Sequence, residues 1–303
     1  MRVELSFFDV MMIIDSHIHI FSPKIIANVS RRREMVDRLH LQVKGAGEKT
    51  TIAALQRDMV AVGVSSSLML PTAAATEVRN TNRLSWSQVL DHDFLLTAGT
   101  LHPDYPANDE ELSWFAEVGI RAIKLCSFSQ GFPLTGPGAR EMFDLIQRHN
   151  ECREKKLFVI LDTLFMASGS FGTAPECDTT PEKLAWLAEE YPLINFIGAH
   201  MGGLSAPEDM LLEYLVPRKN LYLDTSNAAH TLSRDTFVSL VKTHGPEHII
   251  FGTDWPWFSP VSELEIITGL LVAAGFSASE REKVFSGNIA ALLGCGKKDK
   301  IYG

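Results

Sequence analysis

The chain has 303 residues, of which 46% are hydrophobic and 21% are charged, and its formal net charge is −9. A chain of this length can bury a large core, either in two domains or in one α/β barrel. The acidic balance argues against a nucleic-acid partner, because such binding needs a basic surface that displaces counterions.

The sequence also carries information on the cellular location of the protein. It contains four cysteines without CxxC spacing, which is typical of free thiols in a reducing compartment; they are Cys126, Cys152, Cys177 and Cys295. No segment approaches the ~18 apolar residues of a membrane span, so we expect no membrane partner. The first ten residues lack the basic start of a secretion signal. We therefore expect a cytoplasmic protein.

Short β-rich runs alternate with helix-patterned segments along the chain. The predicted strands cover residues 13–20, 64–70, 94–101, 120–126, 157–162, 194–200, 221–226 and 249–254. The predicted helices cover residues 51–62, 76–91, 109–118, 139–154, 181–191, 231–244 and 261–274, and a short helix in 287–294 follows the last strand. Thr180 and Pro181 form one clear helix start, a capping residue followed by proline at the first helical position.

Eight β/α units in 303 residues predict an α/β fold, namely a (β/α)8 barrel. A doubly wound open sheet is the alternative, but no G-x-G-x-x-G follows any strand. We see no internal repeat and no linker. The expected organisation is an N-terminal extension over residues 1–12 and one barrel domain over residues 13–303.

Asp15, His17 and His19 end the first predicted strand. Alternate residues of a strand face the same side, so we expect these three side chains to point the same way. Two imidazoles on one face can bind a single divalent cation, and imidazole nitrogen suits zinc and its first-row neighbours. From this pair alone, histidines that cap a buried strand by hydrogen bonding remain the other interpretation.

The chemistry of a (β/α)8 barrel lies at the C-terminal ends of its strands. The later strand ends and the loop after the third strand contribute further polar residues, namely His102, Lys124, Cys126, Asp162, His200, Asp224, Ser226 and Asp254. With the two histidines, this set suits a cation. Three alternatives stay open: Asp224 can cap a turn, Lys124 can pair with a buried carboxylate, and His102 can either bind a substrate carboxylate or cap its loop.

Six stretches of the chain resemble the amidohydrolase superfamily, in particular its amidohydrolase-related branch of metal-dependent TIM-barrel hydrolases and decarboxylases. They are IIDSHIHIF at 13–21, GIRAIKLCSFSQGFPL at 119–134, FIGAHMGG at 196–203, LYLDTSN at 221–227, IIFGTDWPW at 249–257 and GNIAALLG at 287–294. The resemblance implies that His17 and His19 are metal ligands. It implies that Asp254 contacts the metal and carries a proton, and that His200 activates water or polarises the substrate.

Two positions depart from the pattern of that family. Its fifth strand usually ends in a histidine, where this chain has Asp162, and its fourth-strand motif usually reads Lys-Leu-His-Pro, where this chain has KLCS at 124–127. Carboxylate oxygen also binds Zn²⁺, Mn²⁺ and Fe²⁺. We therefore expect one divalent ion held by His17, His19, Asp162 and Asp254, with zinc first and manganese or iron as alternatives. A carbamylated Lys124 that bridges two metals, as in a binuclear branch, is a further alternative.

The expected partner is a small-molecule substrate, contacted by Lys124 and His102 and by an apolar wall that includes Trp255 and Trp257. The leading hypothesis is a metal-dependent hydrolase that attacks a small carboxylated ester, lactone or amide with a metal-activated water. The alternative is a non-oxidative decarboxylase of an aromatic or enol acid on the same metal site. A non-catalytic binding barrel is the third hypothesis, and a homodimer is left open.

Overall fold

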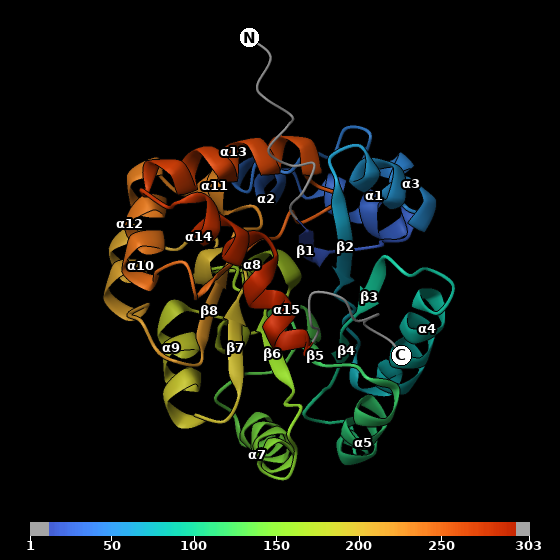
Figure 1. Cartoon of the computed structure of the whole chain (residues 1–303). Coiled ribbons are helices and arrows are strands. Elements are labelled where there is room, and N and C mark those ends of the chain that lie inside the picture. The colour runs from blue at the N-terminus through green and yellow to red at the C-terminus, as the bar shows by residue number, and fades with distance from the viewer. Residues whose placement is uncertain (1–11, 295–303) are drawn as a thin grey trace.

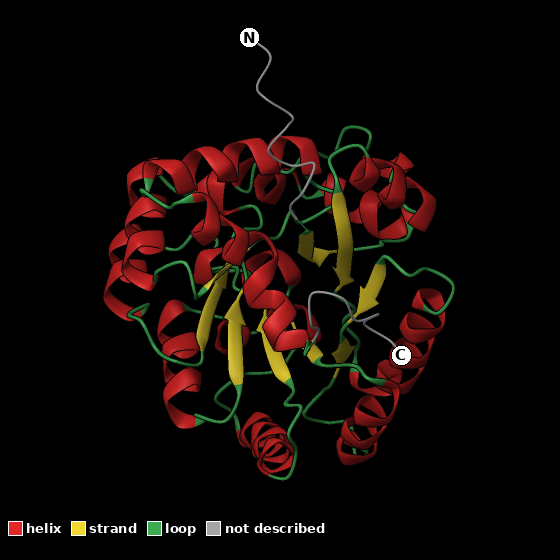
Figure 2. Cartoon of the chain, in the orientation of Figure 1, coloured by secondary structure: helices red, strands yellow, loops and turns green. Residues whose placement is uncertain are grey.

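The computed structural model describes residues 12–294, so most of the predicted N-terminal extension and Cys295 lie outside the described residues. A ring of helices surrounds a central set of strands (Figures 1 and 2). The strands are β1 (Ile13–Ile18), β2 (Val64–Met69), β3 (Leu95–Thr97), β4 (Gly99–Thr100), β5 (Ala122–Leu125), β6 (Phe158–Leu161), β7 (Asn195–Gly198), β8 (Leu221–Asp224) and β9 (Ile249–Ile250). All paired neighbours run parallel.

Backbone hydrogen bonds join these strands into a closed barrel. The strands form two runs, β1-β2-β3 and β4 to β9 in chain order, and β3 and β4 are two parts of the predicted third strand. The seam between β9 and β1 is bridged by three bonds: Ser16 N–H to Phe251 O (3.0 Å), Asp254 N–H to His17 O (2.9 Å) and His19 N–H to Trp255 O (2.7 Å). The predicted (β/α)8 barrel is confirmed.

Each predicted helical segment contains a helix, with ends that differ by a few residues, and the structure adds further helices. The helices are α1 (Pro23–Arg31), α2 (Arg33–Arg38), α3 (Ile52–Val60), α4 (Val78–Val89), α5 (Asn108–Val118), α6 (Ser127–Gln130), α7 (Pro137–Glu151), α8 (Ser168–Phe171), α9 (Pro181–Glu190), α10 (Glu208–Tyr214), α11 (Ala228–Thr231), α12 (Arg234–His244), α13 (Pro260–Ala273), α14 (Ala278–Glu282) and α15 (Asn288–Leu293). The added ones are α1, α2, α6, α8, α10, α11 and α14. At the predicted start of α9, the Thr180 side chain accepts the N–H of Lys183 (3.2 Å). Among the described residues, no helix has the length and apolarity needed to cross a bilayer.

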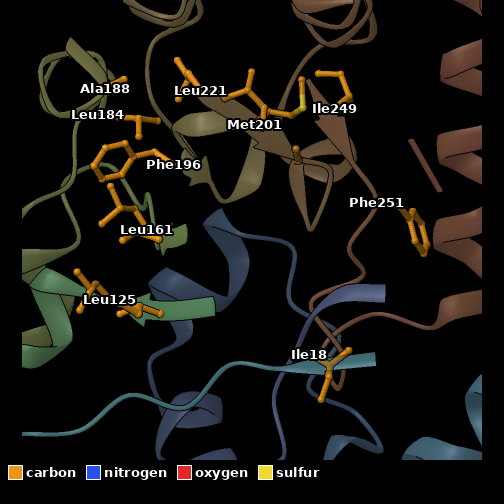
Figure 3. Packing of buried hydrophobic residues seen from close by; sticks show 14 of the residues in the cluster. Ile18, Leu125, Leu161, Leu184, Ala188, Phe196, Met201, Leu221, Ile249 and Phe251 are labelled. Atoms are coloured by element: carbon orange, nitrogen blue, oxygen red, sulfur yellow. The ribbon is translucent and has the colours of Figure 1, made fainter. Parts of the chain in front are cut away.

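Two apolar layers hold the barrel together. Alternate strand residues such as Ile14, Phe158 and Ile160 fill its interior, where they pack with Ile289 and Leu293 of α15 at the N-terminal end. The other strand residues face outward and pack against the helices, as Figure 3 shows for part of this layer. Apolar side chains thus fill both layers, and the polar residues lie at the C-terminal ends of the strands.

The packing of the barrel wall gives a prediction on stability at two glycines. A Cβ added to Gly99 would lie 2.1 Å from the ring of the buried Phe115, whereas one added to Gly269 of α13 meets no atom within 4 Å. We expect Gly99→Ala to lower the free energy of unfolding by about 1–3 kcal/mol through overpacking. Gly269→Ala is expected to raise it by about 0.5–1 kcal/mol through helix propensity. Urea unfolding of both variants tests this, and shifts of the same sign would contradict it.

Candidate active site

His17 and His19 turn their Nε2 atoms toward each other, at 3.2 Å. Their Nδ1 atoms face acceptors that carry no hydrogen to donate: Asp224 Oδ2 lies 2.8 Å from His17, and the carbonyl oxygen of Leu70 lies 3.2 Å from His19. Each Nδ1 therefore carries the proton of a neutral imidazole, and each Nε2 presents a lone pair. Burial lowers the pKa of His17 to about 4 and that of His19 well below its usual value, so both rings are neutral at pH 7.

Asp254 brings a third acceptor to the same place. Its Oδ1 lies 3.7 Å from His19 Nε2 and 4.0 Å from His17 Nε2. Two lone pairs and a carboxylate oxygen thus converge without a hydrogen-bond donor between them. Such a set repels itself unless a cation lies within it, and two imidazoles with a carboxylate suit zinc, manganese or iron. These three residues form a group whose ligand atoms all lie within 4.8 Å of one another.

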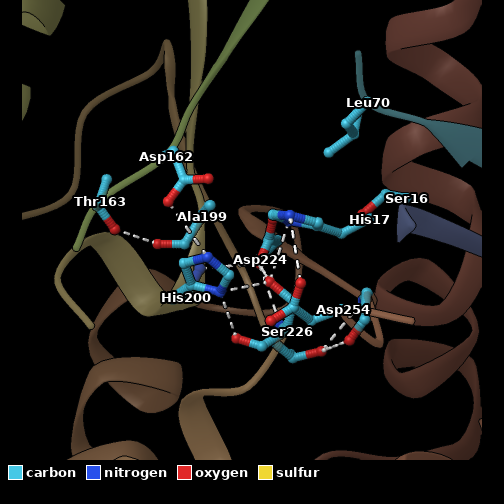
Figure 4. A network of polar contacts seen from close by, with 12 residues as sticks. Ser16, His17, Leu70, Asp162, Thr163, Ala199, His200, Asp224, Ser226 and Asp254 are labelled. Atoms are coloured by element: carbon cyan, nitrogen blue, oxygen red, sulfur yellow. Dashed lines mark hydrogen bonds and ion pairs between the residues drawn. The ribbon is translucent and has the colours of Figure 1, made fainter. Parts of the chain in front are cut away.

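Asp224 and Ser226 orient the side chains of His17 and His200 (Figure 4). Asp224 accepts the His17 ring N–H and, at 2.9 Å, the backbone N–H of His200. The Ser226 hydroxyl donates to Asp224, and its backbone carbonyl accepts the Nδ1–H of His200 at 2.8 Å. Burial opposes ionisation of Asp224, but His17 outweighs it and lowers the Asp224 pKa to about 2. A carboxylate that fixes the tautomer of a ligating histidine is typical of metal centres.

The role of Asp224 was one of the alternatives that the sequence left open. The structure shows a contact with two histidines, and the signal was the D-x-S pattern that ends the seventh strand of the barrel. A second group of possible ligands comprises His17, His200 and Asp224. In that group Asp224 already accepts the Nδ1–H of His17 and the backbone N–H of His200, and the Nδ1–H of His200 donates to the Ser226 carbonyl. It is therefore a hydrogen-bonded cluster that has no need of a cation.

His200, Asp162 and Lys124 form a charged chain beside the histidine pair. Asp162 Oδ2 lies 3.2 Å from Lys124 Nζ, and its Oδ1 lies 3.5 Å from His200 Nε2. Burial opposes the charged form of His200, but Asp162 outweighs it and raises the His200 pKa to about 9. Burial likewise opposes ionisation of Asp162, and Lys124 and His200 outweigh it and hold the Asp162 pKa well below its usual value. His200 is therefore a cation at neutral pH.

The predicted ligand Asp162 thus faces the site but lies outside both groups of three ligand atoms. Its expected role as a fourth ligand stays a prediction. For Lys124, the structure shows the alternative of an ion pair with a buried carboxylate.

Three residues of the site have left-handed backbones. The φ angles are 56° at His200, 56° at Asn227 and 61° at Asp254. Residues other than glycine rarely adopt such angles, at a cost of about 1–3 kcal/mol each, unless the surrounding structure imposes them. Here each residue lies two to four residues past the end of a barrel strand and lines the pocket. The strained conformations therefore turn these three side chains inward at the strand ends.

The expectation that Asp15 accompanies the two histidines is wrong. Its carboxylate accepts hydrogen bonds from the backbone N–H and the hydroxyl of Thr253, at 3.0 and 2.6 Å, and from the N–H of His17. A register shift in β1 between Asp15 and Ile18 breaks the simple alternation of faces. Burial raises the pKa of Asp15 to about 7.

A cavity of about 270 Å³ opens beside these residues. Its described lining includes the expected site residues His19, Lys124, Asp162, His200 and Asp254, together with Trp257. The strand ends therefore bring most of the predicted residues to one pocket.

Two of the predicted substrate contacts do not line this cavity. Trp255 is fully buried in the layer between strands and helices, where its Nε1–H donates to Asp58 at 3.0 Å, so its expected place in the apolar wall is wrong. Both ring nitrogens of His102 bond to the backbone, at Gln130 O and Asp104 N (3.1 Å each), which corresponds to the alternative of a loop cap. Local sequence cannot distinguish Trp255 from Trp257, because both lie in one short loop.

Among solved structures, 5-carboxyvanillate decarboxylase from Sphingomonas paucimobilis is 17% identical, with a TM-score of 0.68 and coverage of 94% of this chain and 100% of that chain. A manganese complex of 5-carboxyvanillate decarboxylase from Novosphingobium aromaticivorans is 16% identical, with a TM-score of 0.64 and coverage of 94% and 96%. A protein from Pseudomonas putida, proposed to be a 2-pyrone-4,6-dicarboxylic acid hydrolase, is 21% identical, with a TM-score of 0.60 and coverage of 94% and 98%.

At these identities the structural likeness shows a common fold. A search of curated proteins gives no match. The family model described as amidohydrolase matches residues 14–295, which include every residue of the site. The chain therefore belongs to the amidohydrolase family, and it is a metal-dependent enzyme, either a hydrolase or a decarboxylase.

Proposed function

We propose that the protein is a metal-dependent hydrolase of a small substrate with an ester, lactone or amide carbonyl. The observation that carries this proposal is the convergence of His17 Nε2, His19 Nε2 and Asp254 Oδ1 with no donor between them. The donor set fits a divalent ion, with Asp162 as the proposed fourth ligand. When bound, such an ion supplies a positive charge that lowers the pKa of a coordinated water from 15.7 toward about 7.

Asp254 is proposed as the proton carrier of the reaction. Burial raises the pKa of its carboxyl group, which makes the carboxylate a stronger base than that of an exposed aspartate. It would accept the proton of the attacking water and deliver it to the leaving group. Its backbone, fixed by the bond from Asp254 N–H to His17 O, keeps that carboxylate at the metal-binding histidines.

His200 is proposed to stabilise the negative charge that develops on the carbonyl oxygen. Its ring is held by Ser226 at Nδ1, while Nε2 faces Asp162. A positioned cation of this kind lowers the free energy of an oxyanion more than it lowers that of the neutral carbonyl.

The cationic His200 also supports the second candidate, a non-oxidative decarboxylase of an aromatic or enol acid. Loss of CO2 leaves a carbanion, which needs a proton donor, and a histidine whose pKa is about 9 is protonated at neutral pH. Product analysis separates the two functions. Release of CO2 without incorporation of water would favour the decarboxylase.

We propose zinc as the metal, with manganese or iron as alternatives. The shell of His17, His19, Asp162 and Asp254 has two neutral and two anionic members, so its charge balances one divalent ion. The homodimer and the cytoplasmic location stay predictions.

The first test of this proposal is metal content. We expect protein from metal-supplemented medium to hold about one transition metal per chain. Replacement of both His17 and His19 by alanine is expected to abolish retention, because it removes two of the converging lone pairs. The control is His92→Ala, a change of the same type outside the cavity. Elemental analysis is the measurement, and equal metal content in the double variant and the wild type would overturn the assignment.

The second test separates Asp254, the proposed ligand and proton carrier, from His200, which is proposed to stabilise the oxyanion without binding the metal. We expect His200→Asn and Asp254→Asn each to lower turnover by ~10²-fold or more, the scale of a lost positioned proton-transfer group. Asp254→Asn is also expected to weaken metal retention, whereas His200→Asn leaves it nearly intact. Steady-state kinetics combined with elemental analysis measures both effects. Equal metal loss in the two variants would make His200 a ligand.

The third test concerns Asp162, which has two candidate roles. If Asp162 is a fourth ligand, either directly or through one water, we expect Asp162→Asn to lower the metal affinity by about tenfold, a loss typical of a weakened set of metal ligands. Competition with a metal-binding dye gives that affinity. Unchanged affinity would leave Asp162 as the ion-pair partner of Lys124 and His200, with no role as a ligand. Asp104→Asn, at an exposed carboxylate outside the cavity, is the control.

A further inference from the structure

The cavity next to the metal-binding histidines has a polar part and a larger apolar part. The polar side chains come from the strand ends. The apolar ones come mainly from the segment after β1 and from the loops after β6 and β9; they include Phe21, Ile25, Met35, Leu39, Phe171 and Trp257. This asymmetry constrains what can bind there, because apolar groups gain free energy when they leave water for such a surface.

The apolar part, apart from Ile25, belongs to a third buried cluster, separate from the two layers of the barrel. In it, Met35 and Leu39 of the α1–α2 segment pack with Phe128 of α6, Leu204 after β7 and Trp257 after β9. Residues that are far apart in sequence thus build one apolar cap over the catalytic end of the barrel. We call this third cluster the apolar cap.

Positive charge in the cavity is limited to its polar part. Among its described lining residues, Lys124 is the one lysine or arginine, and Asp162 lies 3.2 Å from its Nζ and 3.5 Å from Nε2 of the cationic His200. Arg32 stacks over the Phe171 ring, with 4.6 Å between its Cζ and the ring centroid, and is not part of the lining. A substrate with two carboxylates would therefore place the second one on an apolar surface, which is costly.

Asn227 adds a recognition group at the polar part. It is fully buried and lines the cavity, and neither Oδ1 nor Nδ2 has a partner among the described residues. The buried Asn82, Asn150 and Asn220 differ, since their side-chain amides bond to the backbone. A buried amide without partners destabilises the fold unless a ligand pairs with it. Asn227 also follows Ser226, whose carbonyl oxygen holds His200, so it lies beside the proposed oxyanion site.

We infer that the substrate is amphipathic, with one compact oxygen-bearing head that bonds to Asn227 and an aromatic or branched alkyl body under the apolar cap. This inference rests on the proposed function for the position of the reaction, and it adds the substrate class and one substrate-binding residue. The Asn227 Nδ2–H donates to an acyl or carboxylate oxygen of the head. The body needs no second anionic group.

Binding titrations on the metal-loaded protein test the substrate class without use of turnover. The probes are benzoate, 4-butylbenzoate and benzene-1,3-dicarboxylate, and calorimetry gives each Kd. We expect 4-butylbenzoate to bind at least about tenfold more tightly than benzoate, since it buries four more carbons. The dicarboxylate is expected to bind no more tightly than benzoate. Tighter binding of the dicarboxylate, or no gain from the butyl chain, would overturn the inference.

A matched pair of variants tests the apolar part of the cavity lining. Ile25 lines the cavity and is 42% exposed, whereas Ile266 of α13 is 37% exposed and lies outside it. We expect Ile25→Ser to reduce the preference for 4-butylbenzoate over benzoate by about threefold or more. Ile266→Ser leaves that preference unchanged. An equal effect of both variants would contradict a specific role of the apolar lining.

Two variants test Asn227 at little risk to the fold, because both tolerate its positive φ. Asn227→Gly removes the amide, and Asn227→Asp replaces its donor with an acceptor. We expect each to weaken benzoate binding by about tenfold while metal content stays at the wild-type level. Wild-type benzoate affinity in both would overturn the role of Asn227. If the protein holds metal and shows turnover but the binding titrations fail as described, this inference alone is overturned. If the binding titrations give the expected results but the protein holds no metal, the proposed function alone is overturned.

Discussion

The site depends on the hydrogen bond between the His17 ring and Asp224. It joins residues that are 207 positions apart in the chain, at the ends of β1 and β8, so it exists only because the barrel closes. Its consequence is chemical. The bond holds the proton on Nδ1 and leaves the Nε2 lone pair of His17 to face His19 and Asp254. Because Asp224 also accepts the backbone N–H of His200, one buried carboxylate positions both His17 and His200.

The charges of the pocket are divided between two neighbouring groups. The metal-binding group has neutral imidazoles, because burial lowers their pKa values, and a carboxyl group whose pKa burial raises to about 7. In the second group, Lys124 and His200 offset the cost of burying the Asp162 carboxylate, and Asp162 in turn favours the charged form of His200. Histidines that lie a few ångströms apart, such as His17 and His200, therefore differ in protonation state, as acid–base and electrostatic catalysis requires. The same division explains why His17 and His200 suit different roles.

Three apolar clusters frame this polar centre. The barrel interior and the strand–helix layer make a rigid base, and α15 closes the end remote from the site. The apolar cap covers the other end, with contributions from the segment after β1 and from several strand-end loops. Polar side chains are thus confined between two apolar regions, where low polarity strengthens their electrostatic interactions. The strained backbones of His200, Asn227 and Asp254 lie at this boundary.

Local pattern determined much of this protein. The alternation of β-rich and helical segments predicts the barrel, and the rule that chemistry lies at the strand ends locates His17, His19, His200 and Asp254, because periodicity and strand ends are properties of short segments. Only the tertiary structure decided which side chains from distant strands meet. It separated Trp257 from Trp255, paired Asp162 with Lys124, turned Asp15 to Thr253 and left Asn227 unpaired in the pocket. These outcomes depend on register shifts, on left-handed backbone angles and on long-range contacts, none of which residue spacing encodes.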